Sequence, residues 1–247
     1  MRSFTQNFFV FNLLLSAVLA IPLGLADAAL YFKAYENADK FFSQLGFRWD
    51  LATEALEAVL ETFVISLFGV ALGGLVALPV AFMASPLIAS PRLSWAVRWV
   101  SSAVRSIPAV LWAVFFVILV GPGPAAGALA LALYTSTYLV KLFYEALEAV
   151  ERELYDSLRA IGLGGLPLAA ALFTHVKRQV VSHVLFMLEY NVRTATILGF
   201  VGAGGVGYYI QQYLLALDYA AVTPYVVATM VFVIGIDAVS YQLRRRI

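Results

Sequence analysis

The chain of 247 residues contains no cysteine and only two histidines, His175 and His183. Without cysteine, a disulfide framework, a thiolate metal site and a cysteine nucleophile are all excluded. Two histidines eight positions apart do not supply the ligand pairs that haem proteins use. We therefore predict no metal site and no catalytic residue, and a membrane redox subunit is a less favoured alternative for the function.

Charged side chains are also scarce. Only 13% of the residues are Asp, Glu, Lys or Arg, about half of the share in a soluble domain. Hydrophobic residues make up 62% of the chain, and the mean hydropathy is +0.88. A soluble fold of this size could not bury so much apolar surface. The composition predicts an integral membrane protein in contact with lipid, and the net charge of +1 argues against a nucleic-acid partner.

Stretches without charge predict about six membrane-spanning helices, because a helix needs about 20 apolar residues to cross the hydrocarbon core. The first stretch lacks a small-residue cleavage site, so we expect no cleavable signal peptide. "GPGP", residues 121–124, divides the longest stretch into a tight hairpin, whose first arm is lengthened by residues 100–104. Residues 51–61 are expected to form a short amphipathic helix before the second span. The predicted spans are Ser3–Ala26, Thr62–Pro91, the two arms of Ser106–Val140, Gln179–Leu198 and Ala220–Tyr241.

The cations are distributed unevenly between the two sides of this topology. One side carries Arg2, Arg92, Arg98, Arg105, Lys141, Arg152, Arg159, Lys177, Arg178 and Arg244 to Arg246. The other side carries Lys33, Lys40 and Arg48. Cytoplasmic loops of membrane proteins hold the excess of Lys and Arg. Because six spans bring both termini to the richer side, we predict that both termini are cytoplasmic.

"GFVGAGGVGYYI", residues 199–210, contains Gly202, Gly204 and Gly207 in the spacing G-x-G-x-x-G. This spacing occurs in dinucleotide-binding turns. Such a turn needs a soluble βαβ unit and an acidic residue about 20 positions later, where this chain has Val222. We favour a turn beyond the outer end of the fifth span, where backbones approach closely because glycine has no Cβ atom.

The segment before these glycines places Glu189, Asn191 and Arg193 inside the fifth predicted span. Ionisable groups within a membrane usually face a bundle interior or a wet cavity. Glu189 and Arg193 are four residues apart, so they are expected to pair along one helix face. Two interpretations stay open: a pair that only locks helix packing, or a polar face that lines a pathway or gate.

The loop between the fourth and fifth spans, about residues 145–178, begins as a charged amphipathic helix. Its apolar residues recur at helical spacing, and "GLGGLP" then breaks the helix. A short helix held away from the membrane is suited to docking a soluble partner, and an ordinary solvated helix is the alternative. The chain has no G-x-x-x-x-G-K-[ST] run, so it cannot hold ATP phosphates itself.

Within this loop, "EALEAVERELYDSLRAIGLGG" resembles the E-A-A…G loop of bacterial ABC importer membrane subunits. Glu145, Ala146 and Gly162 fall on the motif positions. The resemblance covers most of the chain. The segments "RSIPAVLWAVFFVILVGPGPAAGALALAL", "KLFYEALEAV" and "EYNVRTATILGFVGAGGVG" resemble the phosphonate/phosphite importer permeases in order and spacing. Methionine and glycine-betaine permeases share similar glycine runs, so a methionine or osmolyte importer is the alternative.

The resemblance implies an all-α polytopic helix bundle similar to type I ABC importers, in which residues 1–247 form a single permease domain with a cytoplasmic coupling helix. It implies a bacterial cytoplasmic (inner) membrane location. It also implies a second permease chain, identical or closely related, two ATPase subunits that hold ATP and Mg, and a periplasmic solute-binding protein. This chain itself would bind no cofactor and would not be an enzyme. The expected cargo is phosphonate, phosphite or a related phosphorus oxyanion.

Together with the residue pattern, the resemblance predicts two sets of functional residues. Coupling to the ATPase is assigned to Glu145, Ala146, Glu148, Arg159, Gly162 and Leu163. The translocation pathway or gate is assigned to Glu189, Asn191, Arg193, Thr196, Gly202, Gly204 and Gly205. The chain departs from the family at Thr174 and His175, where a Leu-Pro pair usually closes the coupling loop, and at Ala109, where many relatives have an acidic residue.

Overall fold

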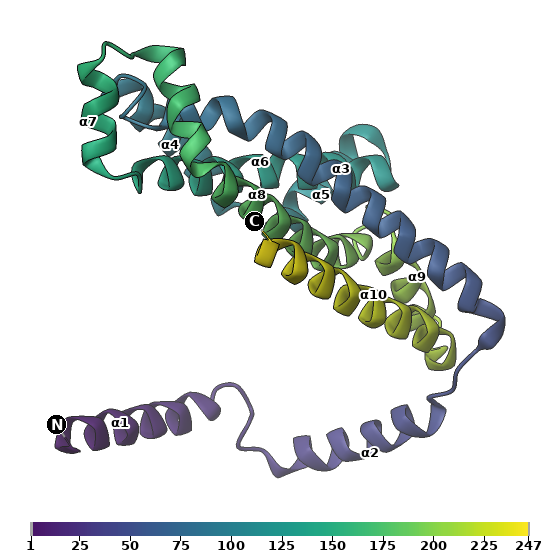
Figure 1. Cartoon of the computed structure of the whole chain (residues 1–247). Coiled ribbons are helices and arrows are strands. Elements are labelled where there is room, and N and C mark those ends of the chain that lie inside the picture. Colours follow the sequence, from purple (N-terminus) through teal and green to yellow (C-terminus); the bar gives the residue numbers. More distant parts are fainter. Residues whose placement is uncertain (1, 247) are drawn as a thin grey trace. The chain divides into compact units, whose positions relative to one another are not determined.

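The structure is a computed structural model that describes residues 2–246, with side chains described from residue 6 onward. All regular secondary structure in this part of the chain is helical (Figure 1). The chain divides into a small N-terminal unit, Met1–Gly46, and a helical bundle, Phe47–Ile247. The two units are described separately, and a single domain over residues 1–247 stays a prediction.

The N-terminal unit consists of α1 (Arg2–Ala20) and α2 (Ala28–Gln44). Helix α1 ends at Ala20, where the chain enters a turn, so it stops before the end of the predicted span Ser3–Ala26. The Asp27 side chain accepts a hydrogen bond of 2.9 Å from Ala29 N and caps the start of α2. The second helix of this unit was not predicted.

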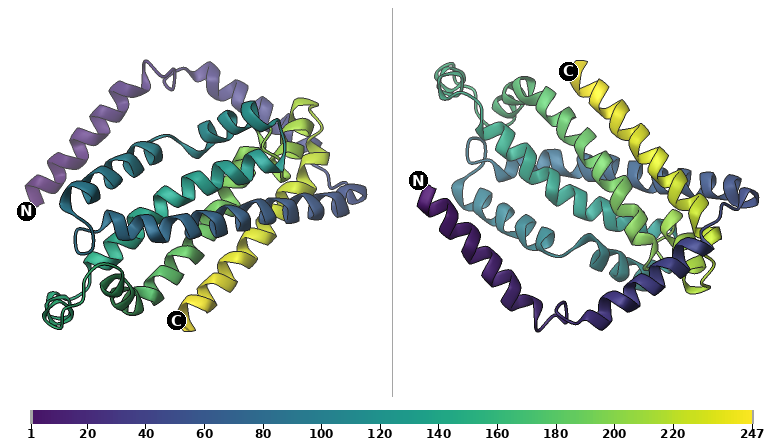
Figure 2. Two further views of the ribbon diagram at one scale, coloured as in Figure 1. Left: turned by 90° about the horizontal axis from the view of Figure 1, so that it is seen from above. Right: turned by 90° about the horizontal axis from the view of Figure 1, so that it is seen from below.

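The bundle contains one 3-10 turn and eight α-helices within the described residues. They are η1 (Trp49–Leu51), α3 (Ala52–Ala84), α4 (Pro91–Ser106), α5 (Ala109–Val120), α6 (Pro124–Glu148), α7 (Arg152–Ala160), α8 (Gly165–Gly199), α9 (Val206–Leu215) and α10 (Tyr219–Arg246). Helix α6 packs against α3, α4, α5 and α8, and the two views of Figure 2 show it running along these neighbours. Figure 1 shows α7 at one end of the bundle and α9 at the other. We call these the α7 end and the glycine-loop end.

The all-α membrane bundle is confirmed. Among residues 2–246, three helical segments are long and apolar enough to cross a membrane: Trp49–Ala84, α6 and α10. The pair α4 and α5 would be a fourth span. The other two predicted spans correspond to α1 and to part of α8, which fall outside this count. Helix α8 has 35 residues, so it is about 50 Å long and exceeds the hydrocarbon core of about 30 Å.

Two details of the predicted spans differ in the structure. Helices α4 and α5 meet at an angle of 84°, so residues 100–104 lie in α4, and the first arm of the hairpin is a bent helix pair and not one straight helix. Pro108 is the last residue of the break and disfavours helical geometry at the preceding residue, Ile107. Residues 52–61 are helical as predicted, but they form the first turns of α3, which continues through Glu61 and Thr62 without interruption.

Two glycines bring α3 against α6. Gly69 and Gly73 are four residues apart in "GVALG". A Cβ atom added to Gly69 would lie 2.7 Å from Leu131 Cβ, and one added to Gly73 would lie 2.9 Å from Thr135 Cβ. In lipid, small residues with this spacing let helix backbones approach closely, and packing rather than hydrophobic burial holds the helices together. The position of α6 at the centre of the bundle depends on this contact.

We predict that Gly69→Ala separates α3 from α6 and lowers the free energy of unfolding by about 1–3 kcal/mol, the usual cost of overpacking. Gly74→Ala is the matched control, because a Cβ atom there would meet only Leu139 Cδ1 at an ordinary 3.7 Å. Thermal unfolding of the purified variants in detergent measures both effects. Equal midpoints for the two variants would contradict the proposed packing.

Candidate functional site

The glycine loop, residues 200–205, joins α8 to α9. Gly202, Gly204 and Gly205 have φ angles of +84°, +77° and +73°, which only glycine adopts without strain. Gly202 O accepts a hydrogen bond of 2.8 Å from Gly123 N. The loop therefore closes against the turn between α5 and α6. Its glycines provide backbone geometry, and the chain has no βαβ unit in the described residues that a dinucleotide would need.

The same loop is tied to α3. Gly205 N donates a hydrogen bond of 3.2 Å to Glu61 Oε1, and Val206 N donates one of 2.8 Å to Thr62 Oγ1. Gly205 and Val206 are the N-cap and the first residue of α9. The backbone N–H groups at the start of a helix have no hydrogen-bond acceptor within that helix. Glu61 and Thr62 therefore cap α9 from a neighbouring helix, a role that the sequence did not reveal.

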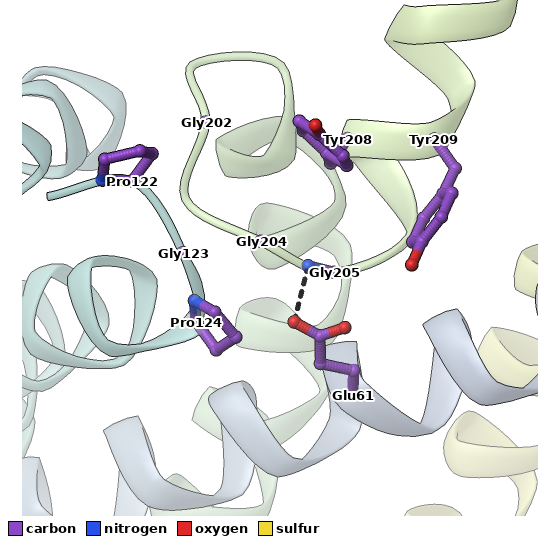
Figure 3. Close-up of a pocket in the computed structure, with 9 residues that line it drawn as sticks. All are labelled: Glu61, Pro122, Gly123, Pro124, Gly202, Gly204, Gly205, Tyr208 and Tyr209. Carbon is purple, nitrogen blue, oxygen red and sulfur yellow. Dashed lines mark hydrogen bonds between the residues drawn. The ribbon is translucent and has the colours of Figure 1, made fainter.

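A cavity of ≈ 290 Å³ lies beside the glycine loop (Figure 3). Its walls include Glu61, Pro122, Pro124, Gly204, Tyr208 and Tyr209. In Figure 3, Glu61 points from α3 toward the loop and the two tyrosine rings stand on α9. Glu61 is the only carboxylate among the residues that line this cavity, and no Lys or Arg lines it. Its negative charge repels an anion, so the cavity in this conformation does not favour anion binding.

The junction of α8 and α9 is the tightest backbone contact described. A Cβ atom on Gly207 would lie 1.8 Å from Thr196 O, and one on Gly199 would lie 2.5 Å from Tyr208 N. Thr196 itself donates its hydroxyl proton to Val192 O at 3.2 Å. Gly207, the third glycine of the G-x-G-x-x-G spacing, is therefore required because α8 and α9 touch.

The predicted ion pair between Glu189 and Arg193 is wrong. Arg193 pairs with Asp237, and Glu189 Oε1 lies 2.8 Å from Arg244 Nη2, in ion-pair but not hydrogen-bond geometry. The physical reason is that Asp237 and Arg244 are seven residues apart on α10, so they lie on one face of it. That face packs against α8, and each charge finds its partner across the helix interface instead of along one helix.

The two ion pairs differ in burial. The Glu189 side chain is 11% exposed, whereas Arg193 and Asp237 are 52% and 41% exposed in the single chain. Arg244 is close to the end of α10, where basic residues mark the membrane boundary. Glu189 is therefore paired with the last turn of α10, and Arg193 lies about one helical turn further along α8.

Asn191 is fully buried and holds α8 to α6. Its Nδ2 donates a hydrogen bond of 2.8 Å to Thr135 Oγ1, and that hydroxyl lies 3.2 Å from Asn191 Oδ1. Both residues have no exposed surface. Because a buried amide must find partners within the protein, Asn191 fixes the packing of these two helices and does not face an open pathway in this conformation.

The predicted coupling residues lie at the α7 end but in two groups. Helix α6 ends at Glu148, and a short non-helical connection leads to α7, which begins at Arg152. Of the α6 group, Ala146 is buried, Glu145 Oε1 lies 3.6 Å from Lys141 Nζ, and Glu148 pairs with Arg98. These contacts join α6 to itself and to α4.

The second group lies in the turn after α7. Arg159 Nη1 donates a hydrogen bond of 3.4 Å to Leu163 O. Gly162 has φ +86° and nothing within 4 Å of an added Cβ atom. Two exposed apolar side chains flank this turn: Ile161 is 74% exposed and Leu166 is 79% exposed. These two residues were missed by the sequence reasoning, although apolar residues beside a glycine break are a readable signal.

At the glycine-loop end, Arg48 links the start of α3 to the turn before α10. It donates hydrogen bonds of 2.7 Å to Asp50 and 3.2 Å to Asp218. Within residues 2–246, no group of three His, Asp or Glu side chains could hold a metal ion.

We predict that Gly207→Ala prevents α9 from docking on α8, because its Cβ atom would overlap Thr196 O. The expected loss exceeds the usual overpacking cost of about 1–3 kcal/mol. Gly235→Ala on α10 is the control, since nothing lies within 4 Å of that position. Size-exclusion chromatography and thermal unfolding compare the two variants, and a stable Gly207→Ala protein would refute the contact.

The ion pair across α8 and α10 gives a second prediction. Arg193→Gln and Asp237→Asn should each lower the free energy of unfolding by about 1–3 kcal/mol, between the values for exposed and buried pairs. The exchange Arg193→Asp with Asp237→Arg should recover much of that loss. Arg152→Gln is the control, because its pair with Asp156 is 92% and 63% exposed. If the exchange is no more stable than the single variants, the two side chains do not pair.

Comparison with known proteins identifies the family. Residues 69–247 match the family described as "Binding-protein-dependent transport system inner membrane component". The chain is 32% identical to the phosphite transport system permease protein PtxC of Stutzerimonas stutzeri over 192 residues, which covers 77% of this chain and 70% of that protein. It is also 32% identical to the phosphate-import permease protein PhnE of Mycolicibacterium smegmatis over 199 residues. That match covers 80% of this chain and spans only 37% of the mycobacterial protein.

Among solved structures, the fold is similar to a chain of the MetNI methionine ABC transporter in an inward-facing conformation. The TM-score is 0.71 at 22% identity, and the match covers 81% of this chain and 99% of that chain. This likeness concerns the fold alone. The family match over residues 69–247, together with the permease relatives at 32% identity, identifies the chain as a member of the binding-protein-dependent transport system inner membrane components, which are ABC transporter permease subunits.

Proposed function

We propose that this chain is the permease subunit of an ATP-driven importer that moves a phosphorus oxyanion, such as phosphonate, phosphite or phosphate, across a bacterial cytoplasmic membrane. The observation that carries the proposal is the 32% identity, over about four fifths of this chain, to permeases named for phosphate and phosphite transport. The methionine importer shares the fold at lower identity, so methionine is the competing cargo in the test.

The proposed orientation places the α7 end and both termini in the cytoplasm. The Lys and Arg residues that were predicted to be cytoplasmic include Arg98, Lys141 and Arg159, which lie on α4, α6 and α7. The glycine loop then lies at the outer face, beneath a periplasmic solute-binding protein. In this conformation the loop is held by α3 and the turn before α6, so we assign to it the role of an outer gate in its closed state.

The energy source is proposed to be a pair of partner ATPase subunits, which would hold ATP and Mg, because this chain has no phosphate-binding loop of its own. Helix α7 and the turn after it would form the docking surface. None of the side chains of α7 is buried, and Ile161 and Leu166 offer apolar contacts beside it. Tyr155 Oη donates a hydrogen bond of 3.3 Å to Leu87 O, which ties α7 to the connection between α3 and α4.

A second copy of the chain, or a close relative, is proposed to complete the pathway. The stripe on α8 that includes Phe186, Tyr190, Arg193 and Ile197 is exposed in the single chain. An Arg–Asp pair facing lipid would be costly, whereas two such stripes facing each other would enclose a polar route. Arg193 would then guide the anion only when its contact with Asp237 opens.

The cargo is tested by uptake into liposomes that contain the full complex of permease, ATPase and binding protein. Radiolabelled phosphate, phosphite and methylphosphonate are compared with methionine and choline. We expect ATP-dependent uptake of at least one phosphorus oxyanion and of neither competitor. Uptake of methionine or choline without any phosphorus oxyanion would refute the proposed cargo and leave the permease family unchanged.

Coupling is tested at Gly162. Its left-handed backbone costs a residue with a Cβ atom about 1–2 kcal/mol, so Gly162→Ala should distort the turn and reduce uptake per ATP hydrolysed. Gly164→Ala is the control, because Gly164 has an extended backbone with φ −149°. Uptake and ATP hydrolysis are measured together in liposomes. If the uptake per ATP hydrolysed is unchanged in both variants, this turn does not couple ATP hydrolysis to transport.

A further inference from the structure

A second cavity, near the α7 end of the bundle, concentrates positive charge between α4 and α6. Its volume is ≈ 230 Å³, which suits a small ionic group better than a drug-sized molecule. The lining side chains used below are Trp95, Arg98, Trp99, Ser102, Arg105 and Lys141. No carboxylate is among the residues that line it. Glu148 and Glu145 lie against Arg98 and Lys141, so three cations and two neighbouring carboxylates leave a net positive charge that is complementary to an anion.

One of the three cations, Arg98, already makes contacts that stabilise the packing of α4 and α6. Arg98 pairs with Glu148, its Nε donates a hydrogen bond of 2.7 Å to Ala84 O, and its guanidinium lies 4.1 Å from the centroid of the Tyr144 ring. These contacts hold Arg98 in place and neutralise its charge. It forms a wall of the cavity rather than the main anion ligand.

The other two cations are less engaged. Lys141 Nζ lies 3.6 Å from Glu145 Oε1, and both side chains are more than 40% exposed, so this pair contributes little. In the described part of the chain Arg105 has no ion pair with a carboxylate: its guanidinium lies 5.8 Å from the centroid of Tyr138, and it interacts electrostatically with Tyr134. The forked donors of arginine match the oxygen atoms of a tetrahedral phosphorus group. Arg105 and Lys141 therefore leave donors free toward the cavity.

The depth of the cavity fits the level of lipid headgroups. Lys141 lies roughly 25 Å along α6 from Pro124, at 1.5 Å per residue, which is comparable with the hydrocarbon thickness of about 30 Å. Trp95 and Trp99 are 67% and 64% exposed on the outward face of α4, as in the aromatic belts at membrane interfaces. The buried face of α4 carries the small residues Ser94 and Ser101 instead.

We propose that Arg105 and Lys141 form a binding site for a tetrahedral phosphorus oxyanion, which either an anionic phospholipid headgroup or a free phosphate or phosphonate would supply. The ligand would sit against Trp95 and Trp99, with the Arg98 wall behind it. The site is separate from the predicted pathway residues and does not require the proposed transport cargo. A failed uptake experiment would leave this proposal standing, and a failed binding experiment would leave the cargo standing.

The test uses the full chain in nanodiscs, with two arms that distinguish the sources. In the first arm, phosphatidylglycerol is mixed with phosphatidylcholine, and the phosphatidylglycerol retained per chain after detergent extraction is measured by mass spectrometry. In the second arm, inorganic phosphate or methylphosphonate is titrated into nanodiscs of phosphatidylcholine alone, and tryptophan fluorescence reports binding. We expect binding in at least one arm.

Arg105→Gln should weaken that binding by roughly tenfold, equivalent to ~1.4 kcal/mol, and Arg105→Lys should weaken it less. Arg92→Gln is the matched control, because Arg92 is exposed on the same helix outside the cavity. If Arg105→Gln fails to fold, Ser102→Asp provides a second variant, since it adds a carboxylate at an exposed position of the wall. The proposal is overturned if neither arm shows binding, or if Arg92→Gln weakens it as much as the cavity variants.

Discussion

Close approach of helix backbones through glycine is the constraint on which the rest of the bundle depends. In lipid, an apolar side chain gains little free energy when it moves from a lipid contact to a protein contact. Helices therefore associate where their backbones can pack tightly. Gly69 and Gly73 provide this contact between α3 and α6, and Gly207 provides it between α8 and α9. Gly127 continues the pattern, because an added Cβ atom there would lie 2.5 Å from Ala203 O in the glycine loop.

Hydrogen bonds and ion pairs between helices add to the close packing at the glycines. Once α6 and α8 are close, Asn191 and Thr135 satisfy each other inside the bundle. Once α10 lies along α8, two charges on each helix find partners across the interface. At the glycine-loop end, Glu61 and Thr62 supply the acceptors that the first donors of α9 lack. The loop between α8 and α9 thus has a defined closed arrangement, as a gate requires, although its role as a gate is a proposal.

Much of the fold could be predicted from the sequence, because composition, charge-free stretches and glycine spacing are local signals. The α-helical membrane bundle, the turn at residues 121–124 and the glycine loop as a close backbone contact all followed from such signals. The pairing of Glu189 and Arg193 did not, because Asp237 and Arg244 lie more than 40 residues away in the chain and reach them only after α10 packs. The bend at Pro108 was readable, but a long apolar run outweighed it. The cavity between α4 and α6 was also not predicted, because its cations come from two helices and were interpreted only as indicators of orientation.

The central claim is that the glycine loop docks on the turn between α5 and α6 and closes this end of the bundle. A Cβ atom added to Gly202 would lie 3.7 Å from Pro122 Cβ, within the range of about 3.5–4.5 Å for disulfides. A cysteine at Gly202 also bears the strain of a φ angle of +84°, so the folded state of the variant is checked first. The most direct measurement is therefore oxidation of the variant Pro122→Cys with Gly202→Cys, on a chain that has no other cysteine, followed by intact mass and thiol labelling. We expect an intrachain disulfide that blocks labelling of both thiols, whereas Pro122→Cys with Gly235→Cys stays reduced. Two thiols that remain free and label fully in the folded protein under the same oxidation would contradict the account.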